Sequence, residues 1–289
     1  MSGSGIIPSI GKIQKEISVW ETRVAEKEKD ASILSIKIQD IKIGLNVFLG
    51  KYYSKVGIVY VKLDKLNLRI KEYQHRINLA QSKRPSQEDL NIIEEEIDEI
   101  FSRERSKVDS LESEASESSE EYRRHLEEEK EEHLDHEFQK ELKKLFRKLA
   151  LRFHPDRAKD DKQKKEFHKI MAAINEAYKN KDLETLKKYM KQAEREEKIA
   201  KETLEEKLTR LKEDYKIILG IIAKLRAELE DLKANETYKL KEKDDKAKKE
   251  GRDLLQELAT SIKAEISENQ MRLDELVAQY KKIIGSLAY

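Results

Sequence analysis

The sequence predicts an all-α protein made largely of elongated coiled-coil helices, and three features of its composition support this class. Of its 289 residues, 41% are charged, 37% are hydrophobic and only 6% are aromatic. Only nine glycines and three prolines are present, so few residues interrupt a helix. A composition rich in Lys, Glu, Leu, Ile and Ala is typical of long helices, and its apolar mass is too small for one large core. We therefore expect narrow helix–helix seams to hold most of the buried surface.

An N-terminal coiled coil is predicted over residues 10–82, after a flexible stretch at 1–9. Its apolar residues recur mostly at spacings of three and four, and they are Ile10, Ile13, Ile17, Trp20, Val24, Ala31, Leu34, Ile38, Ile41, Leu45 and Phe48. After Tyr52 the pattern resumes from Val56 with an offset of four residues, which is a stutter that locally unwinds a supercoil. Glycines at 44, 50 and 57 lie near this point, so a bend or a hairpin turn is the alternative.

Residues 83–138 form a separate acidic helical and low-complexity segment. Pro85 and the Ser86–Asp89 pair, which resembles a capping box, predict that a new helix begins near Gln87. The stretch SLESEASESSEE at 110–121 has little to bury, and we expect a spacer or a frayed helix there. Residues 86–138 carry 21 acidic and 6 basic side chains, a net charge of −15, whereas residues 139–192 carry +9. Two opposed blocks of charge therefore adjoin in the chain.

Residues 193–289 are predicted to form a C-terminal coiled coil. Heptad-spaced apolar residues run from Leu204 to Leu232 and again from Leu255 to Leu287, on either side of the interruption KANETYKLKEK. Asn235 suits a turn or cap in this interruption, so we expect a helical hairpin, with one continuous helix as the alternative. Narrow apolar stripes are unstable as lone helices in water. The two terminal regions should therefore pair as an intramolecular antiparallel bundle, with a homodimer as a further option.

The stretch LALRFHPDR at 149–157 departs from the charged-helix pattern. Pro155 cannot continue a helix and disfavours helical geometry at His154. The inward face of the preceding helix consists of Leu142, Phe146, Leu149 and Phe153, and its outward face consists of Lys143, Lys144, Arg147, Lys148 and Arg152. A polar loop and a second amphipathic stretch follow, with an apolar face of Phe167, Ile170, Met171, Ile174, Ala177 and Tyr178. The pattern predicts two antiparallel helices whose connecting loop displays His154 and Asp156.

These residues resemble a known module. LKKLFRKLALRFHPDR resembles helix II and the His-Pro-Asp signature loop of the J domain, the co-chaperone module of the DnaJ family, and MAAINEAY at 171–178 resembles the end of its helix III. Phe146 and Phe153 stand where the family usually has tyrosine, and Met171 stands where it usually has phenylalanine. The resemblance covers residues 140–180, and we assign a J-domain-like module to 139–192. The order of coiled coil, J module and coiled coil resembles bacterial-type J-domain proteins rather than DnaJ itself.

The resemblance implies docking rather than catalysis. J domains bind a DnaK-type chaperone ATPase and stimulate its ATP hydrolysis, so we expect no enzymatic activity and no cofactor. The implied chaperone-binding residues are His154, Pro155, Asp156, Lys143, Lys144, Arg147, Lys148 and Arg152. The basic face would meet an acidic surface of the ATPase, and Asp156 would pair with a basic residue there. The coiled coils would recruit the chaperone to a protein that they bind.

Several parts of the family pattern are missing. Helix I has no clear counterpart, and EEYRRHLEEEKEEHLDHEF could run into helix II as one long helix. Helix IV is replaced by NKDLETLKKYM, and packing against the coiled coil could take the place of helix I. The zinc-binding cysteines, Gly/Phe-rich linker and β-rich client-binding domains of DnaJ are also absent. Client binding of the DnaJ kind therefore cannot be inferred.

Other classes of function receive less support. The chain has no cysteine, which removes disulfides and thiolate sites. His125, His133 and His136 are better explained as solvated histidines than as metal ligands. The basic segment is a weak candidate for nucleic-acid binding, because its aromatic residues belong to the inward face. No apolar run is long enough to span a membrane, so we predict a cytoplasmic protein.

Two alternatives stay open. The chain could be a structural coiled-coil scaffold or adaptor with a vestigial J module. Separately, glutamates of the acidic segment could shield the basic face until a partner displaces them, although a solvated spacer explains the same charges. The glutamates in question are Glu127, Glu128, Glu129, Glu131 and Glu132.

Overall fold

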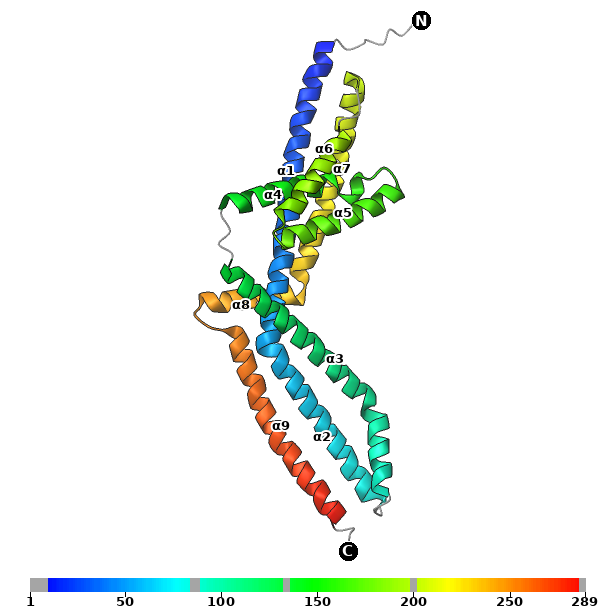
Figure 1. Ribbon diagram of the computed structural model, residues 1–289, viewed down its shortest axis with the longest axis vertical. Coiled ribbons are helices and arrows are strands. Elements are labelled where there is room, and N and C mark those ends of the chain that lie inside the picture. The colour runs from blue at the N-terminus through cyan, green and yellow to red at the C-terminus, as the bar shows by residue number, and fades with distance from the viewer. Residues whose placement is uncertain (1–9, 84–88, 132–135, 198–201, 286–289) are drawn as a thin grey trace. The chain divides into compact units, whose positions relative to one another are not determined.

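The computed structural model describes residues 10–83, 89–131, 136–197 and 202–285. Within those ranges all regular structure is helical and no strand occurs, which confirms the all-α class. The helices are α1 (Ile10–Tyr52), α2 (Ile58–Lys83), α3 (Asp89–Glu131), α4 (His136–Arg152), α5 (Asp161–Lys179), α6 (Leu183–Glu197), α7 (Leu204–Ala234), α8 (Glu236–Lys249) and α9 (Leu254–Gly285) (Figure 1). The chain divides into two compact units, one of residues 1–44 with 133–238 and the other of residues 45–132 with 239–289.

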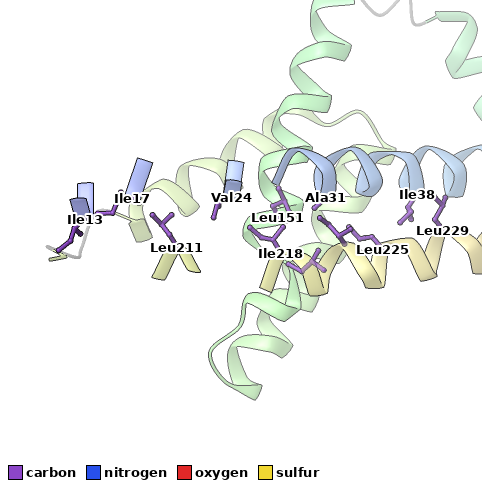
Figure 2. Close-up of a cluster of buried hydrophobic side chains, with 12 residues drawn as sticks. Ile13, Ile17, Val24, Ala31, Ile38, Leu151, Leu211, Ile218, Leu225 and Leu229 are labelled. Carbon is purple, nitrogen blue, oxygen red and sulfur yellow. The ribbon is translucent and has the colours of Figure 1, made fainter. Parts of the chain in front are cut away.

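The first unit is built on a pair of helices, the part of α1 before Leu45 and α7. Their apolar stripes meet in one cluster that contains Ile13, Ile17, Val24, Ala31, Ile38, Leu211, Ile218, Ile221, Ile222, Leu225 and Leu229 (Figure 2). Burying a side chain of this size contributes about 1.5–3 kcal/mol, so the seam holds the pair together. The prediction that the N- and C-terminal stripes pair within one chain is confirmed.

The direction of this pairing differs from the prediction. Glu21 contacts Lys207 at 2.7 Å and Lys42 contacts Glu228 at 2.6 Å, so residue numbers rise together along α1 and α7. The helices are parallel, and the predicted antiparallel bundle is wrong. Lys42 and Glu228 are 186 residues apart, and the intervening chain returns to the N-terminal end of α1 before α7 begins. Heptad spacing alone does not distinguish the two directions.

In the second unit α9 packs on α2, again in parallel. Apolar clusters between them include Leu63 with Ile262, and Leu66 with Leu273. An amide pair lies in the same seam, where Asn269 Nδ2 donates to Asn67 Oδ1 at 2.8 Å. Since the stripe of α7 packs on α1 and that of α9 packs on α2, the predicted hairpin of residues 193–289 is wrong. Its expected break is confirmed, because Asn235 Oδ1 caps the start of α8 by accepting the amide of Thr237 at 2.8 Å.

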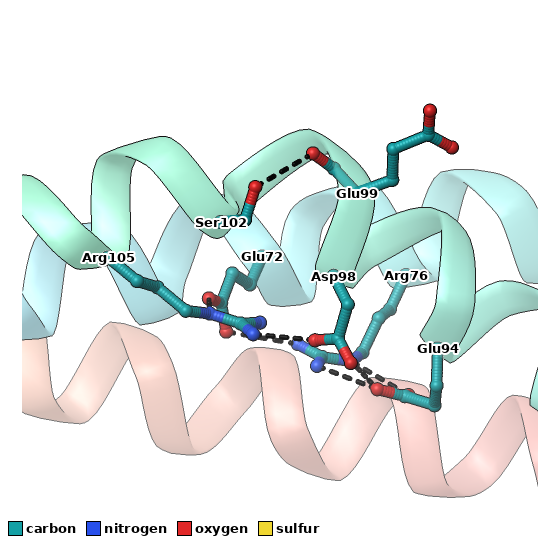
Figure 3. A network of polar contacts seen from close by, with 7 residues as sticks. All are labelled: Glu72, Arg76, Glu94, Asp98, Glu99, Ser102 and Arg105. Atoms are coloured by element: carbon teal, nitrogen blue, oxygen red, sulfur yellow. Dashed lines mark hydrogen bonds and ion pairs between the residues drawn. The ribbon is translucent and has the colours of Figure 1, made fainter.

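Helix α3 packs antiparallel on α2 through both apolar and charged contacts. Ile93 and Ile97 are fully buried against the end of α2. Beside them, Arg105 donates to Glu72 at 2.6 Å and Arg76 donates to Glu94 at 2.8 Å (Figure 3). Glu72 is 8% exposed, and its carboxylate is contacted by both arginines, because Arg76 also lies 3.4 Å from it. The network therefore fixes the alignment of α2 and α3.

The stutter in the N-terminal stripe coincides with a π-helical turn at Tyr53–Gly57. A π turn adds a residue to the helical repeat, so it can absorb a change of phase in the apolar pattern without ending the helix. Val56, inside the turn, is 0% exposed and packs with Phe48 and Leu63. The glycines near this point do not form the hairpin turn that was the alternative.

The serine-rich stretch at 110–121 is neither a spacer nor a frayed end, because α3 continues through it to Glu131. Ala115 and Ser119 are 2% and 5% exposed. At Gly50 an added Cβ would lie 2.6 Å from the Cβ of Tyr122, so the absent side chain lets α1 and α3 approach closely. Small residues therefore allow this polar segment to pack, although it lacks large apolar side chains.

Candidate functional site

The region around the His-Pro-Asp loop is built on α4, α5 and α6. Phe146 and Leu149 of α4, with Phe153 directly after the helix, are at most 1% exposed and form the centre of the core. Phe146 packs against the ring of Tyr178 at a centroid distance of 4.4 Å, and Phe153 meets Phe167 edge-on at 5.5 Å. The spacing of these residues puts them on one face of α4, which leaves the charged residues on the other. The predicted pair of amphipathic helices is confirmed.

Helix α1 supplies part of this core. Ile36 is 7% exposed and Ile43 is half-buried, and both pack in the same cluster as Phe146. At the edge, Tyr178 Oη donates to Asp40 at 2.9 Å, and burial together with this bond raises the pKa of the Tyr178 phenol. Helix α1 thus contributes to the core of α4 to α6, and the suggestion that it takes the place of helix I stays a prediction. The other suggestion, that the segment before α4 continues into it, lies partly outside the described residues at 132–135.

The segment expected to replace helix IV is itself helical and forms α6. Asp182 caps it by accepting the amide of Thr185 at 2.9 Å. Lys181, just before this cap, has a φ of 56° and turns the chain between α5 and α6. Leu186 is 0% exposed and Ala193 is 4% exposed, both in the core with Phe146. A third helix therefore completes the module.

The basic face of α4, which we define as Lys143, Lys144, Arg147, Lys148 and Arg152, is largely open to solvent. The first four are exposed and Arg152 is half-buried. Lys143 lies 3.7 Å from Asp40. Among the described residues no ion pair is seen for Lys144, Arg147 or Lys148. The predicted shielding glutamates lie outside the residues whose side chains are described, so shielding stays a hypothesis. The exposed basic face is therefore accessible to an acidic surface of a partner.

The signature loop begins where α4 ends. His154 has an extended backbone, with φ −64° and ψ 131°, as expected before proline, and Pro155–Arg157 form a single 3-10 turn. His154 Nδ1 accepts the amide of Asp156 at 3.2 Å, so the imidazole caps the turn that carries the carboxylate. On the far side, Asp160 Oδ1 accepts the amide of Gln163 at 2.7 Å and starts α5. The loop is thus defined by caps at both ends.

His154 is neutral in this arrangement. Burial lowers the pKa of its imidazole, an effect that the nearby Asp156 carboxylate opposes. Nδ1 also lies 4.0 Å from Asp156 Oδ2, a distance that would suit an ion pair only with a protonated ring. Because Nδ1 accepts the Asp156 amide, it has no proton to donate, and we assign the neutral form. The predicted role of orienting the loop has a geometric basis in this bond.

This assignment predicts a pH dependence. Since the pKa of His154 is below its ordinary value of 6.5, the unfolded chain takes up a proton before the folded chain does. The contribution of His154 to the unfolding free energy is therefore unchanged above pH 6.5 and declines as the pH falls below it. In urea unfolding monitored between pH 7 and pH 5, His154→Asn should show a shallower decline than the unmutated protein. Identical slopes would contradict the assignment.

Asp156 and Arg157 make contacts that the sequence did not disclose. Lys224 Nζ on α7 donates to Asp156 Oδ1 at 2.7 Å, and Arg157 Nη2 donates to Glu28 Oε1 on α1 at 2.9 Å. Asp156 is consequently only 20% exposed. The partners lie 68 and 129 residues away in sequence, and each is one charge among many on a solvated heptad helix. No signal in the sequence marks either of them.

No group of residues that could hold a metal ion occurs in the part of the chain that the structure describes. The side chains of His125, His133 and His136 fall outside that part, so the interpretation of these histidines is untested. None of the described helices is both long enough and apolar enough to cross a membrane.

Comparison with known proteins identifies the module. Residues 134–182 match the family model of the DnaJ domain. This match contains α4, the His-Pro-Asp loop and α5. The chain therefore carries a J domain at residues 134–182. No curated protein and no solved structure matches the chain.

Proposed function

We propose that this protein is a J-domain co-chaperone that docks on a DnaK-type chaperone ATPase and stimulates its ATP hydrolysis. The observation that carries the proposal is the open basic face of α4 beside an intact His-Pro-Asp loop, within the segment that matches the DnaJ domain. A DnaK-type partner follows from the presence of a J domain. The use of these particular residues is our inference.

The basic face and the loop would act at different stages of docking. Exposed cations steer a partner through long-range attraction, which mainly raises the association rate and falls with salt. Asp156, which is mostly buried, would instead pair with a basic residue of the ATPase after close contact. Lys144, Arg147 and Lys148 would therefore set how fast the complex forms, and Asp156 would set how effective it is.

The long helix pairs would provide a second function. They hold most of the chain outside residues 134–182, so we propose that they bind a protein to which the chaperone is brought. In this proposal the protein is cytoplasmic, is not an enzyme, needs no cofactor and has neither nucleic acid nor a membrane as a partner. A homodimer stays a prediction that light scattering can test.

A structural scaffold with a vestigial J module is the second candidate, and one observation favours it. An intact signature loop argues for docking only if the loop has no other use. In the structure the loop does have one, because Asp156 and Arg157 bind α7 and α1. The two candidates differ in whether a DnaK-type chaperone binds the α4 face.

A binding measurement separates them. Lys144, Arg147 and Lys148 are replaced together by glutamine, and the association rate of the full chain with an ATP-bound DnaK-type chaperone is measured at low and moderate salt. We expect a rate at least about tenfold lower at low salt, with a weaker salt dependence, because steering is lost. The matched control replaces Lys263, Lys281 and Lys282, exposed lysines of α9, and removes the same charge. Equal rates in the two triple variants would contradict docking through α4.

A further inference from the structure

The carboxylate of Asp156 is already bound to a cation of this same chain. Lys224 Nζ lies 2.7 Å from Asp156 Oδ1 and 2.7 Å from Oδ2, so both oxygens are engaged. The Asp156 side chain is 20% exposed, whereas the Lys224 side chain is 66% exposed. The carboxylate therefore lies in the interface with α7, and the lysine reaches it from the solvent side.

Two further contacts hold the same end of the module on the α1–α7 pair. Arg157 Nη2 donates to Glu28 Oε1 at 2.9 Å. Leu151, on α4, is 9% exposed and belongs to the apolar cluster between α1 and α7, together with Ile218 and Leu225 (Figure 2). Two charged contacts and one apolar contact thus hold the loop against α1 and α7.

We propose that Lys224 competes with the chaperone for the carboxylate of Asp156. In the free chain the Lys224–Asp156 ion pair then occupies the docking loop, and we call this arrangement the self-occupied state. This inference rests on the proposed function, in which Asp156 pairs with a basic residue of the chaperone. An ammonium group offers the carboxylate the same kind of partner. One carboxylate in this position cannot serve both cations, so chaperone binding requires Lys224 to leave.

The Lys224 side chain can leave Asp156 readily. Lys224 is a long, mostly exposed side chain, so it can swing into solvent without any change in α7 or in the core of the J module. Exposed ion pairs are weak and are screened by salt, so the self-occupied state reduces docking without preventing it. The basic face of α4 stays open meanwhile, and a chaperone could first contact it and then take Asp156 from Lys224.

The magnitude of the effect follows from the strength of such a pair. If the pair favours the self-occupied state to the extent usual for exposed ion pairs, its removal should increase the fraction of free loop about two- to fivefold. The apparent affinity for the chaperone should rise by the same factor, because affinity scales with the fraction that is competent to bind. The gain should shrink as salt rises.

The test uses the full-length protein with Lys224 replaced by glutamine. Affinity for an ATP-bound DnaK-type chaperone is measured at low and moderate salt, beside two controls. Lys224→Arg keeps a cation opposite Asp156 and should resemble the unmutated protein. Lys216→Gln removes another exposed lysine of α7 and should also resemble it. Amide hydrogen exchange of Arg157 and Ala158, which close the loop turn, should be faster in Lys224→Gln alone.

The outcomes are distinct. Two- to fivefold tighter binding in Lys224→Gln, absent from both controls and lost at higher salt, supports the competitor. Unchanged or weaker binding in Lys224→Gln, while the unmutated protein binds, overturns it and leaves the proposed function standing. If neither protein binds the chaperone, the proposed function fails and the competitor fails with it. Unchanged exchange of the loop amides would show that Lys224 does not hold the loop, which also overturns the proposal.

Discussion

Replacing Ile218 by aspartate should separate α7 from α1, with a loss of unfolding free energy above about 4 kcal/mol. Ile218 is 0% exposed in the middle of the seam. The substitution removes a large apolar contact and places a carboxylate in an apolar cluster, and burying an unpaired charge is among the most destabilising of single changes. The measurement is urea unfolding monitored by circular dichroism.

The adjacent residue provides the control. Ile217 is 37% exposed and does not belong to the buried cluster, so Ile217→Asp should change the unfolding free energy by less than about 1 kcal/mol. The two variants carry the same substitution at adjacent positions, so they differ only in the burial of the new carboxylate. Similar losses in the two would show that α7 does not pack on α1 through this stripe.

Replacing Phe146 by alanine should cost about 3–5 kcal/mol and should disrupt the module of α4, α5 and α6 first. Phe146 is 1% exposed and packs on Tyr178, so its removal leaves a cavity among residues from four helices. The loss of packing should also free Ile36 and Ile43 of α1 from their contacts. Amide exchange resolved along the chain would show faster exchange in α4 to α6.

Phe138, at the start of α4, is only half-buried and serves as the control. Phe138→Ala removes a ring of the same size with less lost contact, so it should destabilise the protein markedly less. If the two alanine variants lose the same amount, Phe146 is not at the centre of the core.

Much of the fold was predictable because the seams follow a regular period. The stripe from Ile13 to Ile38 and the stripe from Leu211 to Leu229 identify the residues that α1 and α7 bury. The same periodicity cannot say which stripe meets which, or in which direction. The pattern around Ile218 would equally suit packing on a hairpin partner, on a second copy of the chain or on α1. Which helix Ile218 meets depends on the path of the intervening chain.

The packed helix at residues 110–121 was not predictable for a different reason. Its expected weakness came from the lack of large apolar residues between positions 110 and 121. Burial of Ala115 and Ser119, with Gly50 opposite, shows that small side chains can also make a tight contact. Such contacts are invisible to a search for apolar stripes, because alanine and serine are common on exposed helices too.

The part of the candidate site that is formed by residues close in sequence was predictable. The contacts between residues far apart in sequence were not. The His-Pro-Asp loop and the basic face are each contained in a few consecutive turns, so residues 142–157 define them. Lys224 and Glu28 meet the loop only because α4 packs on the α1–α7 pair through Leu151. An exposed lysine on a heptad helix has no feature that distinguishes it from its neighbours.

The most direct test of the central claim is the single-turnover rate of ATP hydrolysis by a DnaK-type chaperone with the full-length protein added. The unmutated chain should accelerate hydrolysis in a concentration-dependent way, and Asp156→Asn should reduce this acceleration more than about tenfold. Asparagine has nearly the same size but no charge, and losing one member of a desolvated charge pair typically costs about 2–5 kcal/mol. Circular dichroism should show that the variant keeps its helices. Hydrolysis that is not accelerated by the unmutated chain, or is accelerated equally by Asp156→Asn, would contradict the account.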